Sequence, residues 1–420
     1  MIRGFLVRAR ESSTLRILTV FASANMIAMV LSGIGGILQA RWVRPEVLGE
    51  FHKYGILTSY LALGLVIVQD GLCRQYPYLI GRGDTDGARK VASVAKTWYV
   101  IVAGISVLLF LVLSMNSLLR GDCRAAVGWG VQIIASVAAS YGVFLQTIYR
   151  RSLEFRRLSY NGLISSLVGF ASLLWVRFFG YFGLAVKTLS TVAIRLALDA
   201  KYIPVRIRMG WDQRCFLNLV KISVPLSIEG YIRTSFSTAT FGYFVLKFCG
   251  QEDLGLFGVA AAFEGFAMVF VSSLTQFFDV KMANSFGRQN SLSESVKQLI
   301  RPTFFGFVVS IACAIVLCVL IGPFIRLMVP NYVGAIPIVY ILSAELILGA
   351  LLLPTRIMRV ALMYKSIYFV TIVRVVSLVL GMLLVPRDIR WLASCKIISE
   401  VIAVGLGYFL LYSSILKEKE

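Results

Sequence analysis

Long apolar runs alternate with short polar loops along the whole chain of 420 residues. The runs are about 20 residues long, which is the length a helix needs to cross the hydrocarbon core of a bilayer. We therefore predict an all-α polytopic membrane protein with about twelve spans, the fifth and sixth being separated by little more than Gly180. The expected spans are Ile17–Ala40, Phe51–Asp70, Thr97–Leu118, Val127–Tyr149, Ser159–Phe179, Tyr181–Ile203, Leu219–Leu246, Leu254–Phe278, Thr303–Leu320, Val333–Leu353, Ile367–Val385 and Trp391–Leu411.

Two polar stretches share a pattern at an offset of 206 positions. Arg41–Phe51 reads R-W-V-R-P-E-V-L-G-E-F and Lys247–Phe257 reads K-F-C-G-Q-E-D-L-G-L-F, with a basic residue, Glu, Leu, Gly and Phe at equal spacing. The same offset maps the first six spans onto the second six. This parallel repeat predicts two six-helix lobes, residues 1–206 and 207–420, with the substrate path between them. We expect Arg41–Phe51 to be an outward-facing turn shaped by its Pro and Gly.

Composition agrees with a membrane protein. Hydrophobic residues make up 58% of the chain and charged residues 15%, against about 25% charged residues in soluble domains. The net charge of +21 does not indicate nucleic acid, because the basic residues gather at the N-terminus and in every second loop. That bias predicts cytoplasmic termini, with membrane lipids as partners of the basic loops.

Several predicted spans carry charged side chains, each of which costs roughly 2.5–3.5 kcal/mol at bilayer depth on insertion scales. Opposite charges four residues apart lie on one helix face and can either neutralise each other or serve transport. These pairs are Asp70 with Arg74, Arg195 with Asp199, Glu229 with Arg233, and Lys396 with Glu400.

Three further charges, Glu264, Glu345 and Arg374, have no such partner on their own helix. They are expected either to form salt bridges between helices of the C-terminal half or to face a wet cavity, where the carboxylates would couple transport to a cation. Arg177 and Lys187 flank the connection between the fifth and sixth spans, and either reach the outer interface or face a cavity of the N-terminal half.

Other chemistry has little support. The single histidine, His52, and the seven cysteines show no metal-binding spacing, and every loop is too short to hold a soluble catalytic domain. We therefore expect no metal, no cofactor and no catalytic residue. Pro225 lies early in the seventh span and permits a kink there.

Four segments carry a resemblance to a known family. They are R-P-E-V-L-G-E-F in the first loop, G-R-G-D-T-D-G-A-R-K at Gly81–Lys90, K-I-S-V-P-L-S-I at Lys221–Ile228 and G-Q-E-D-L-G-L-F at Gly250–Phe257. They resemble Wzx-type lipid-linked oligosaccharide flippases (O-antigen and polysaccharide flippases) of the multidrug/oligosaccharidyl-lipid/polysaccharide exporter superfamily.

The resemblance implies two lobes in a V around a central cavity, as in MATE transporters, in a bacterial cytoplasmic (inner) membrane. It also implies an undecaprenyl-diphosphate-linked oligosaccharide as cargo, carried to the periplasmic leaflet for O-antigen or other surface polysaccharide, with other polysaccharide-assembly membrane proteins as partners. No binding residue is carried over from the family.

Our own candidates come from the intramembrane charges. Arginine and lysine suit a diphosphate, because phosphate oxygens accept charge-assisted hydrogen bonds. The cationic-cavity candidates are Arg74, Arg177, Lys187, Arg195, Arg233 and Arg374. The candidates for coupling to a proton or sodium gradient are Asp70, Glu229, Glu264 and Glu345.

Three alternatives remain open. A cation-coupled multidrug exporter of the same superfamily would need an acidic cavity, because its cargo is usually cationic. A membrane enzyme of polysaccharide assembly would need a long outer loop or a carboxylate motif at the interface, and the sequence has neither. A scaffold without transport activity fits poorly with so many intramembrane charges.

Overall fold

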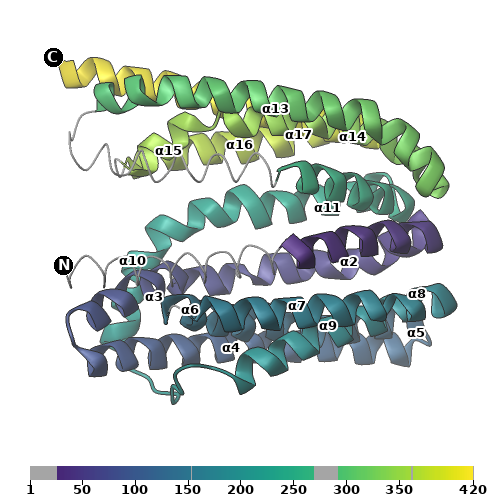
Figure 1. The fold of residues 1–420 in the computed structure, drawn as a ribbon, viewed down its shortest axis with the longest axis horizontal. Helices are drawn as coiled ribbons and strands as arrows, with labels where there is room; N and C mark the ends of the chain where they lie inside the picture. Colours follow the sequence, from purple (N-terminus) through teal and green to yellow (C-terminus); the bar gives the residue numbers. More distant parts are fainter. Residues whose placement is uncertain (1–25, 153, 269–291, 361–362, 420) are drawn as a thin grey trace, which may run out of the picture. The chain divides into compact units, whose positions relative to one another are not determined.

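A computed structural model describes residues 26–152, 154–268, 292–360 and 363–419. Nearly all of these residues are helical, and the described part of the chain contains no strand (Figure 1). The predicted all-α fold is therefore confirmed.

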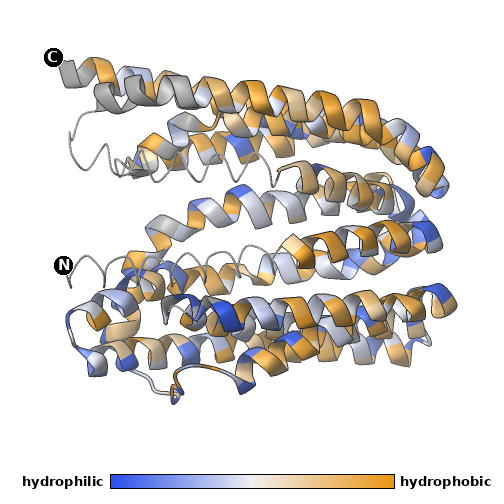
Figure 2. Cartoon of the chain, in the orientation of Figure 1, coloured by the Kyte–Doolittle hydropathy of each residue, from blue (hydrophilic) through white to orange (hydrophobic). Residues whose placement is uncertain are grey.

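The membrane spans also agree with the prediction. By length and apolar composition, eight described helices could cross a bilayer, and two bent helix pairs raise the number to ten. The eight are Thr85–Leu119, Cys123–Arg150, Arg156–Phe179, Tyr181–Lys201, Thr303–Met328, Pro330–Ala350, Tyr364–Leu384 and Ile389–Leu416. Each contains or overlaps one predicted span, and the helices are apolar over much of their length (Figure 2). The first and eighth predicted spans, Ile17–Ala40 and Leu254–Phe278, lie partly outside the described residues. Their described parts are helical and belong to helices of residues 26–42 and 251–268.

The contacts divide the chain into two compact units. The first consists of Met1–Val43, in its described part, and Tyr54–Ile228, whereas the second consists of Arg44–Lys53 and Glu229–Glu420. The predicted lobes, residues 1–206 and 207–420, follow the sequence repeat and stay a prediction.

The first unit has a core of large side chains from four helices. Its helices are Met26–Trp42, the last part of α2 (Pro45–Leu61), α3 (Leu63–Gly81), α4 (Thr85–Leu119), α5 (Cys123–Val137), η1 (Ala138–Gly142), α6 (Val143–Arg151), α7 (Phe155–Ala171), α8 (Leu173–Phe179), α9 (Tyr181–Lys201) and most of α10 (Gln213–Tyr231). Leu72, Tyr99, Phe144 and Leu219, from α3, α4, α6 and α10, are fully buried together. Through Leu219, the first part of α10 packs into the core of this unit.

The second unit contains the helices that carry the candidate site. They are η2 (Ile232–Phe236), α11 (Ser237–Phe248), a helix of residues 251–268, α13 (Leu292–Met328), η3 (Pro330–Ala335), α14 (Ile336–Ala350), α15 (Leu353–Val360), α16 (Tyr364–Leu384) and α17 (Ile389–Lys419). Phe241 of α11 packs on Phe257 with ring centroids 4.5 Å apart. Leu342, Leu346 and Leu392 complete the buried interior of α14 and α17.

The repeat is visible in the helix boundaries. Residue 251 begins a helix 206 positions after Pro45, which begins α2. The starts of α9 at Tyr181 and α17 at Ile389 are 208 positions apart. These two pairs of helix starts lie within two positions of the 206-residue offset of the sequence repeat.

The stretch Arg41–Phe51 differs from its expected form. Only Val43 and Arg44 form the turn, because Pro45 already begins α2, and proline is well tolerated in the first helical turn. Gly49 therefore lies inside the helix rather than in a loop. A Cβ on Gly49 would stand 1.6 Å from the backbone oxygen of Gln251.

Gly255 makes the reciprocal close contact with the start of α2. A Cβ on Gly255 would stand 2.0 Å from the backbone oxygen of Pro45. Gly49 and Gly255 are equivalent positions of the repeat, as are Pro45 and Gln251. The shared Gly thus allows two helix starts to meet backbone against backbone, which only a residue without a side chain permits.

Breaks in the helices explain three further connections. Gly180, at φ +52°, separates α8 from α9 as expected. The helix bends by 54° between Gln213–Pro225 and Ser227–Phe248, which agrees with the predicted effect of Pro225. A second bend, of 52° at Ala62, was not expected because no proline lies at that point.

Candidate functional site: a buried charge network

A network of buried charges lies among the helices of the second unit. Glu345 comes from α14, Arg374 from α16, Lys396 and Glu400 from α17, and Glu264 from the helix of residues 251–268. α17 packs against both α14 and α16, so the charged positions of three helices meet. These five residues are called the charge network below.

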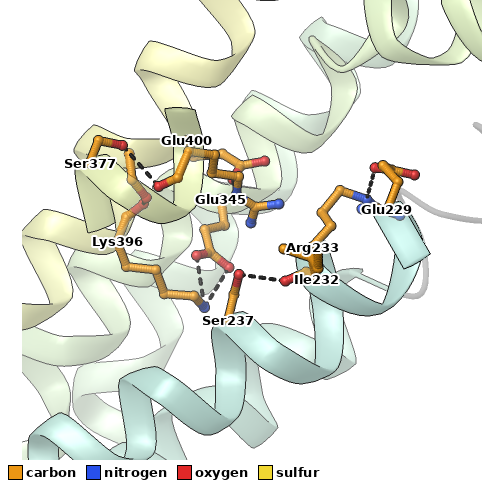
Figure 3. Close-up of polar contacts among 10 residues, drawn as sticks. Glu229, Ile232, Arg233, Ser237, Glu345, Ser377, Lys396 and Glu400 are labelled. Carbon is orange, nitrogen blue, oxygen red and sulfur yellow. Dashed lines mark hydrogen bonds and ion pairs between the residues drawn. The ribbon is translucent and has the colours of Figure 1, made fainter. Parts of the chain in front are cut away.

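Two ion pairs join the helices of the network. Lys396 Nζ lies 2.8 Å from Oε1 and 2.9 Å from Oε2 of Glu345, so the ammonium group contacts both carboxylate oxygens (Figure 3). Arg374 Nε lies 2.6 Å from Glu400 Oε2. All four side chains are at most 17% exposed, so the pairs are largely shielded from solvent and lipid.

These pairs correct one expectation and confirm another. Lys396 and Glu400 were expected to pair along α17, but each instead meets an opposite charge on a neighbouring helix. Spacing of i,i+4 places two groups on one face, but it does not prevent a closer partner across the interface. Glu345 and Arg374 do form salt bridges between helices, as one of the two interpretations proposed.

Glu264 gives the network a third carboxyl group. Its side chain is buried beside the carboxyl of Glu345. With all five groups ionised the network would have one negative charge in excess, which burial strongly disfavours. Binding of one proton or one monovalent cation by the network would remove that excess.

Glu229 and Arg233 lie beside the network. Arg233 Nε is 3.4 Å from Glu229 Oε1, which confirms the expected pair along one helix. Arg233 belongs to the π-helical turn η2, which contacts α16, whereas the following α11 contacts α17. Ser237 donates a hydrogen bond to the Ile232 carbonyl across this turn (Figure 3). π-turns inside helices occur frequently at functional sites.

In the first unit, Arg195 is held by a polar cluster. Its Nε lies 2.8 Å from Asp199 Oδ2, as the spacing predicted. Asn161 donates to Oδ1 of the same carboxylate at 2.8 Å, and Tyr149 donates to the Asp199 carbonyl at 3.1 Å. Gly162 leaves room for the guanidinium, because a Cβ there would lie 2.4 Å from Arg195 Nη1. Asp199 therefore connects α9 to α6 and α7, and Arg195 supplies the cation that its buried carboxylate needs.

The other cationic candidates of this unit are bound more loosely. Lys187 donates to the Gln39 side chain, and Arg177 lies over the Trp42 ring at 5.6 Å. Arg74 is exposed and does not form the expected ion pair with Asp70. Among the described residues, Arg74, Arg177 and Lys187 have no carboxylate partner.

The structure thus brings together Glu264, Glu345 and Arg374 of the predicted candidates. It adds Lys396 and Glu400, which the sequence presented only as a pair within one helix. The signal that could have found them is that both lie at bilayer depth, as do the three charges without partners. Within the described residues, no three His, Cys, Asp or Glu side chains are arranged to hold a metal ion.

Known proteins resemble this chain in sequence family and in fold. The family model described as polysaccharide biosynthesis protein matches residues 37–277, more than half of the chain. No curated protein matches this chain. An inward-facing multidrug resistance MATE family transporter of the MOP superfamily is similar with a TM-score of 0.68 at 13% identity, covering 96% of this chain and 98% of the other.

Two further structures carry the same fold. An outward-facing MATE family transporter of the MOP superfamily has a TM-score of 0.62 at 15% identity, with 96% of each chain covered. A MOP superfamily transporter from Pyrococcus furiosus, described as having a binding pocket of reverse polarity that suggests a different function, has a TM-score of 0.59 at 16% identity, with 96% of each chain covered. This chain therefore belongs to the polysaccharide biosynthesis protein family and has the fold of the MOP superfamily transporters.

Proposed function

We propose that this chain is a flippase that carries undecaprenyl-diphosphate-linked oligosaccharide repeat units across the bacterial cytoplasmic membrane by alternating access. The cargo serves O-antigen or another surface polysaccharide. The observation that carries the proposal is the match to the polysaccharide biosynthesis family in a chain with the MOP transporter fold. Both termini are proposed to be cytoplasmic, and membrane proteins of polysaccharide assembly are the proposed partners.

The cargo sets the physical problem. A diphosphate and a hydrated glycan must pass roughly 30 Å of hydrocarbon while a polyprenyl chain stays in lipid. Cationic side chains are needed to replace the water around the diphosphate. Arg74, Arg177 and Lys187 are the best-suited candidates, because no carboxylate among the described residues neutralises them.

Arg195, Arg233 and Arg374 are proposed in a secondary role. Each already has a carboxylate within 3.4 Å. A diphosphate would have to compete with that carboxylate for the same donors, so these arginines contribute less to binding and more to holding helices in place.

The charge network is the proposed coupling site. The carboxyls of Glu264 and Glu345 lie together with Lys396 as their nearest cation. Loss of a bound proton would leave the buried group with one excess negative charge, so protonation can favour one packing of the helices over another. A sodium ion could compensate the same negative charge as a proton. Transport assays with pH and sodium gradients distinguish the two ions. Asp70 and Glu229 are weaker coupling candidates.

A cation-coupled multidrug exporter is the second candidate function. Its support is the similarity of fold to MATE family transporters. The fold alone does not decide the cargo, since the Pyrococcus furiosus transporter shares it and is described as having a pocket of reverse polarity. The polysaccharide family match favours the flippase.

Deletion of the gene followed by lipid analysis tests the proposal. We expect undecaprenyl-linked repeat units to accumulate on the cytoplasmic face and surface glycan to fall. The chain supplied in trans should restore both. Unchanged surface glycan together with drug hypersensitivity would instead support the multidrug exporter.

A further inference from the structure

The connection between α9 and α10 is irregular in conformation but fastened to the side of α4 (Figure 1). Lys96 Nζ donates to the Ile207 carbonyl at 2.7 Å. Thr97 Oγ1 donates to the Gly210 carbonyl at 2.9 Å and accepts from the Gly210 N–H at 3.1 Å. These bonds hold the backbone of the connection, so its side chains are not free to move as those of a loose loop are.

Side-chain contacts continue the attachment. Lys90 Nζ forms an ion pair with Asp212 at 2.6 Å. Phe216, in the first turn of α10, packs between Trp98 and Trp211 with ring centroids 4.9 Å and 4.8 Å away. The connection is thus fixed to α4 by four side chains within nine residues.

The side chains of this fixed connection differ in exposure. Ile207 is buried against α4, whereas its neighbours Arg206 and Arg208 are exposed. Met209 and Trp211 follow on the exposed side, 57% and 51% exposed. The surface formed by Arg206, Arg208, Met209 and Trp211 is called the linker strip.

The length of α4 and the predicted start of its span place the linker strip at the expected depth of lipid headgroups. α4 has 35 residues and is therefore about 52 Å long, against roughly 30 Å of hydrocarbon. Its first turns must project from the core, and Thr97 is where the predicted span begins. The loop charges place this end on the cytoplasmic side, where anionic lipids reside.

We infer that the linker strip is a binding site for the headgroup of an anionic phospholipid in the cytoplasmic leaflet. The Arg206 and Arg208 guanidinium groups bind the headgroup phosphate, for which their planar donors are suited. Met209 and Trp211 lie in the interface, where tryptophan is favoured. Asp212, the only carboxylate in this connection, is already neutralised by Lys90, so it does not oppose an anion.

The inference does not depend on the identity of the cargo. Diffuse attraction to the leaflet acts on all exposed basic residues alike, but the two arginines of the linker strip stand on a backbone held by hydrogen bonds to α4. A held strip binds more tightly than a flexible loop of equal charge, because less side-chain and backbone freedom is lost on binding. A specific site and diffuse attraction can therefore be distinguished by comparing two pairs of exposed arginines of equal charge.

The test uses the full chain in nanodiscs of phosphatidylcholine with or without phosphatidylglycerol, and native mass spectrometry counts the phosphatidylglycerol molecules retained. The double variant R206Q/R208Q should bind phosphatidylglycerol about tenfold or more weakly. R156Q/R157Q removes two exposed arginines from the first turn of α7, on the same predicted side, and should stay within about twofold of the wild type. Thr97→Val, which keeps both arginines but releases Gly210, should weaken retention too.

Three results would overturn the inference. Equal weakening in both double variants would show a diffuse field, no weakening in R206Q/R208Q would exclude the site, and equal retention of the neutral lipid would exclude selectivity. Size-exclusion profiles confirm that each variant is folded, and the single variant R208Q replaces the double variant if that one is not. No cargo is present, so a negative result leaves the flippase proposal intact.

Discussion

Lys396 of α17 pairs with Glu345 of α14 at 2.8 Å rather than with Glu400 one turn along its own helix. Glu400 in turn pairs with Arg374 of α16. The two pairs therefore join three helices electrostatically, and each charge depends on a partner carried by another helix. In a buried network of this kind, removing one partner leaves an uncompensated charge.

The Lys396–Glu345 pair should show this asymmetry in stability. Lys396→Met leaves Glu345 buried without its cation and should destabilise the protein by about 3–5 kcal/mol. The double variant K396M/E345M removes both charges and should be clearly more stable than K396M. Thermal unfolding in detergent measures the difference, and equal unfolding temperatures for the single and double variants would rule out a direct interaction.

Coupling should depend on Glu264 and Glu345. Glu264→Gln and Glu345→Gln cannot exchange a proton, so transport in proteoliposomes should no longer respond to an imposed pH gradient. Asp86→Asn is the control, because Asp86 is a highly exposed carboxylate at the start of α4. Loss of the response to a sodium gradient instead would identify the other ion. If both Glu variants keep the wild-type response to pH and sodium gradients, the coupling role is wrong.

Variants of Arg195 and Lys187 should distinguish a cation needed for stability from a cation that binds the cargo. Arg195→Gln leaves Asp199, which is fully buried, without its cation, so the protein should lose about 3–5 kcal/mol of stability. Lys187→Gln removes a cation whose partner is only the Gln39 amide, so folding should persist while the affinity for a lipid diphosphate falls about tenfold. Binding of farnesyl diphosphate, compared with farnesol, measures the second effect. If Arg195→Gln instead weakens lipid binding and Lys187→Gln instead destabilises the fold, the structural and cargo-binding roles are exchanged.

Charge reversal tests the cationic candidates that are already paired. Arg374→Glu and Arg195→Glu each place a carboxylate against another carboxylate, and both should abolish transport. If both variants express and transport at wild-type rates, neither position contributes to the cavity or to the packing that forms it.

Gly49 and Gly255 should not tolerate a methyl group. Alanine at either position meets backbone atoms within 2.0 Å, so the helices must separate, and we expect a loss of roughly 1–3 kcal/mol. Gly36→Ala is the matched control, because no atom lies within 4 Å of a Cβ there, and it should be neutral or slightly stabilising. Unfolding temperatures of the three variants decide the matter, and equal values would contradict the close approach of these helices.

The helices and the repeat could be predicted because they depend on local composition. Apolar runs fix where a span lies, and even the narrow break at Gly180 is visible, since glycine alone adopts its left-handed conformation freely. The helical start at Pro45 was missed because the same Pro and Gly that mark turns also suit a helix start and a close helix contact. The bend at Ala62 has no proline and thus no local signal.

The partners of buried charges could not be predicted, because they depend on how helices are rotated about their axes. The i,i+4 rule was right for Arg195 and Arg233, each of which pairs with the carboxylate four residues away. It was wrong for Lys396, where α14 presents Glu345 to the same face. Sequence gives the depth of a charge in the membrane, but packing decides which opposite charge it meets.

The most direct measurement is flipping by the purified protein. Proteoliposomes containing a fluorescent undecaprenyl-diphosphate-linked oligosaccharide would be assayed for its movement between leaflets, with and without a pH gradient. We expect translocation that depends on the protein, is accelerated by the gradient and is lost in the Glu345→Gln variant. Absence of translocation by folded protein, together with export of cationic dyes by the same vesicles, would contradict the proposed function.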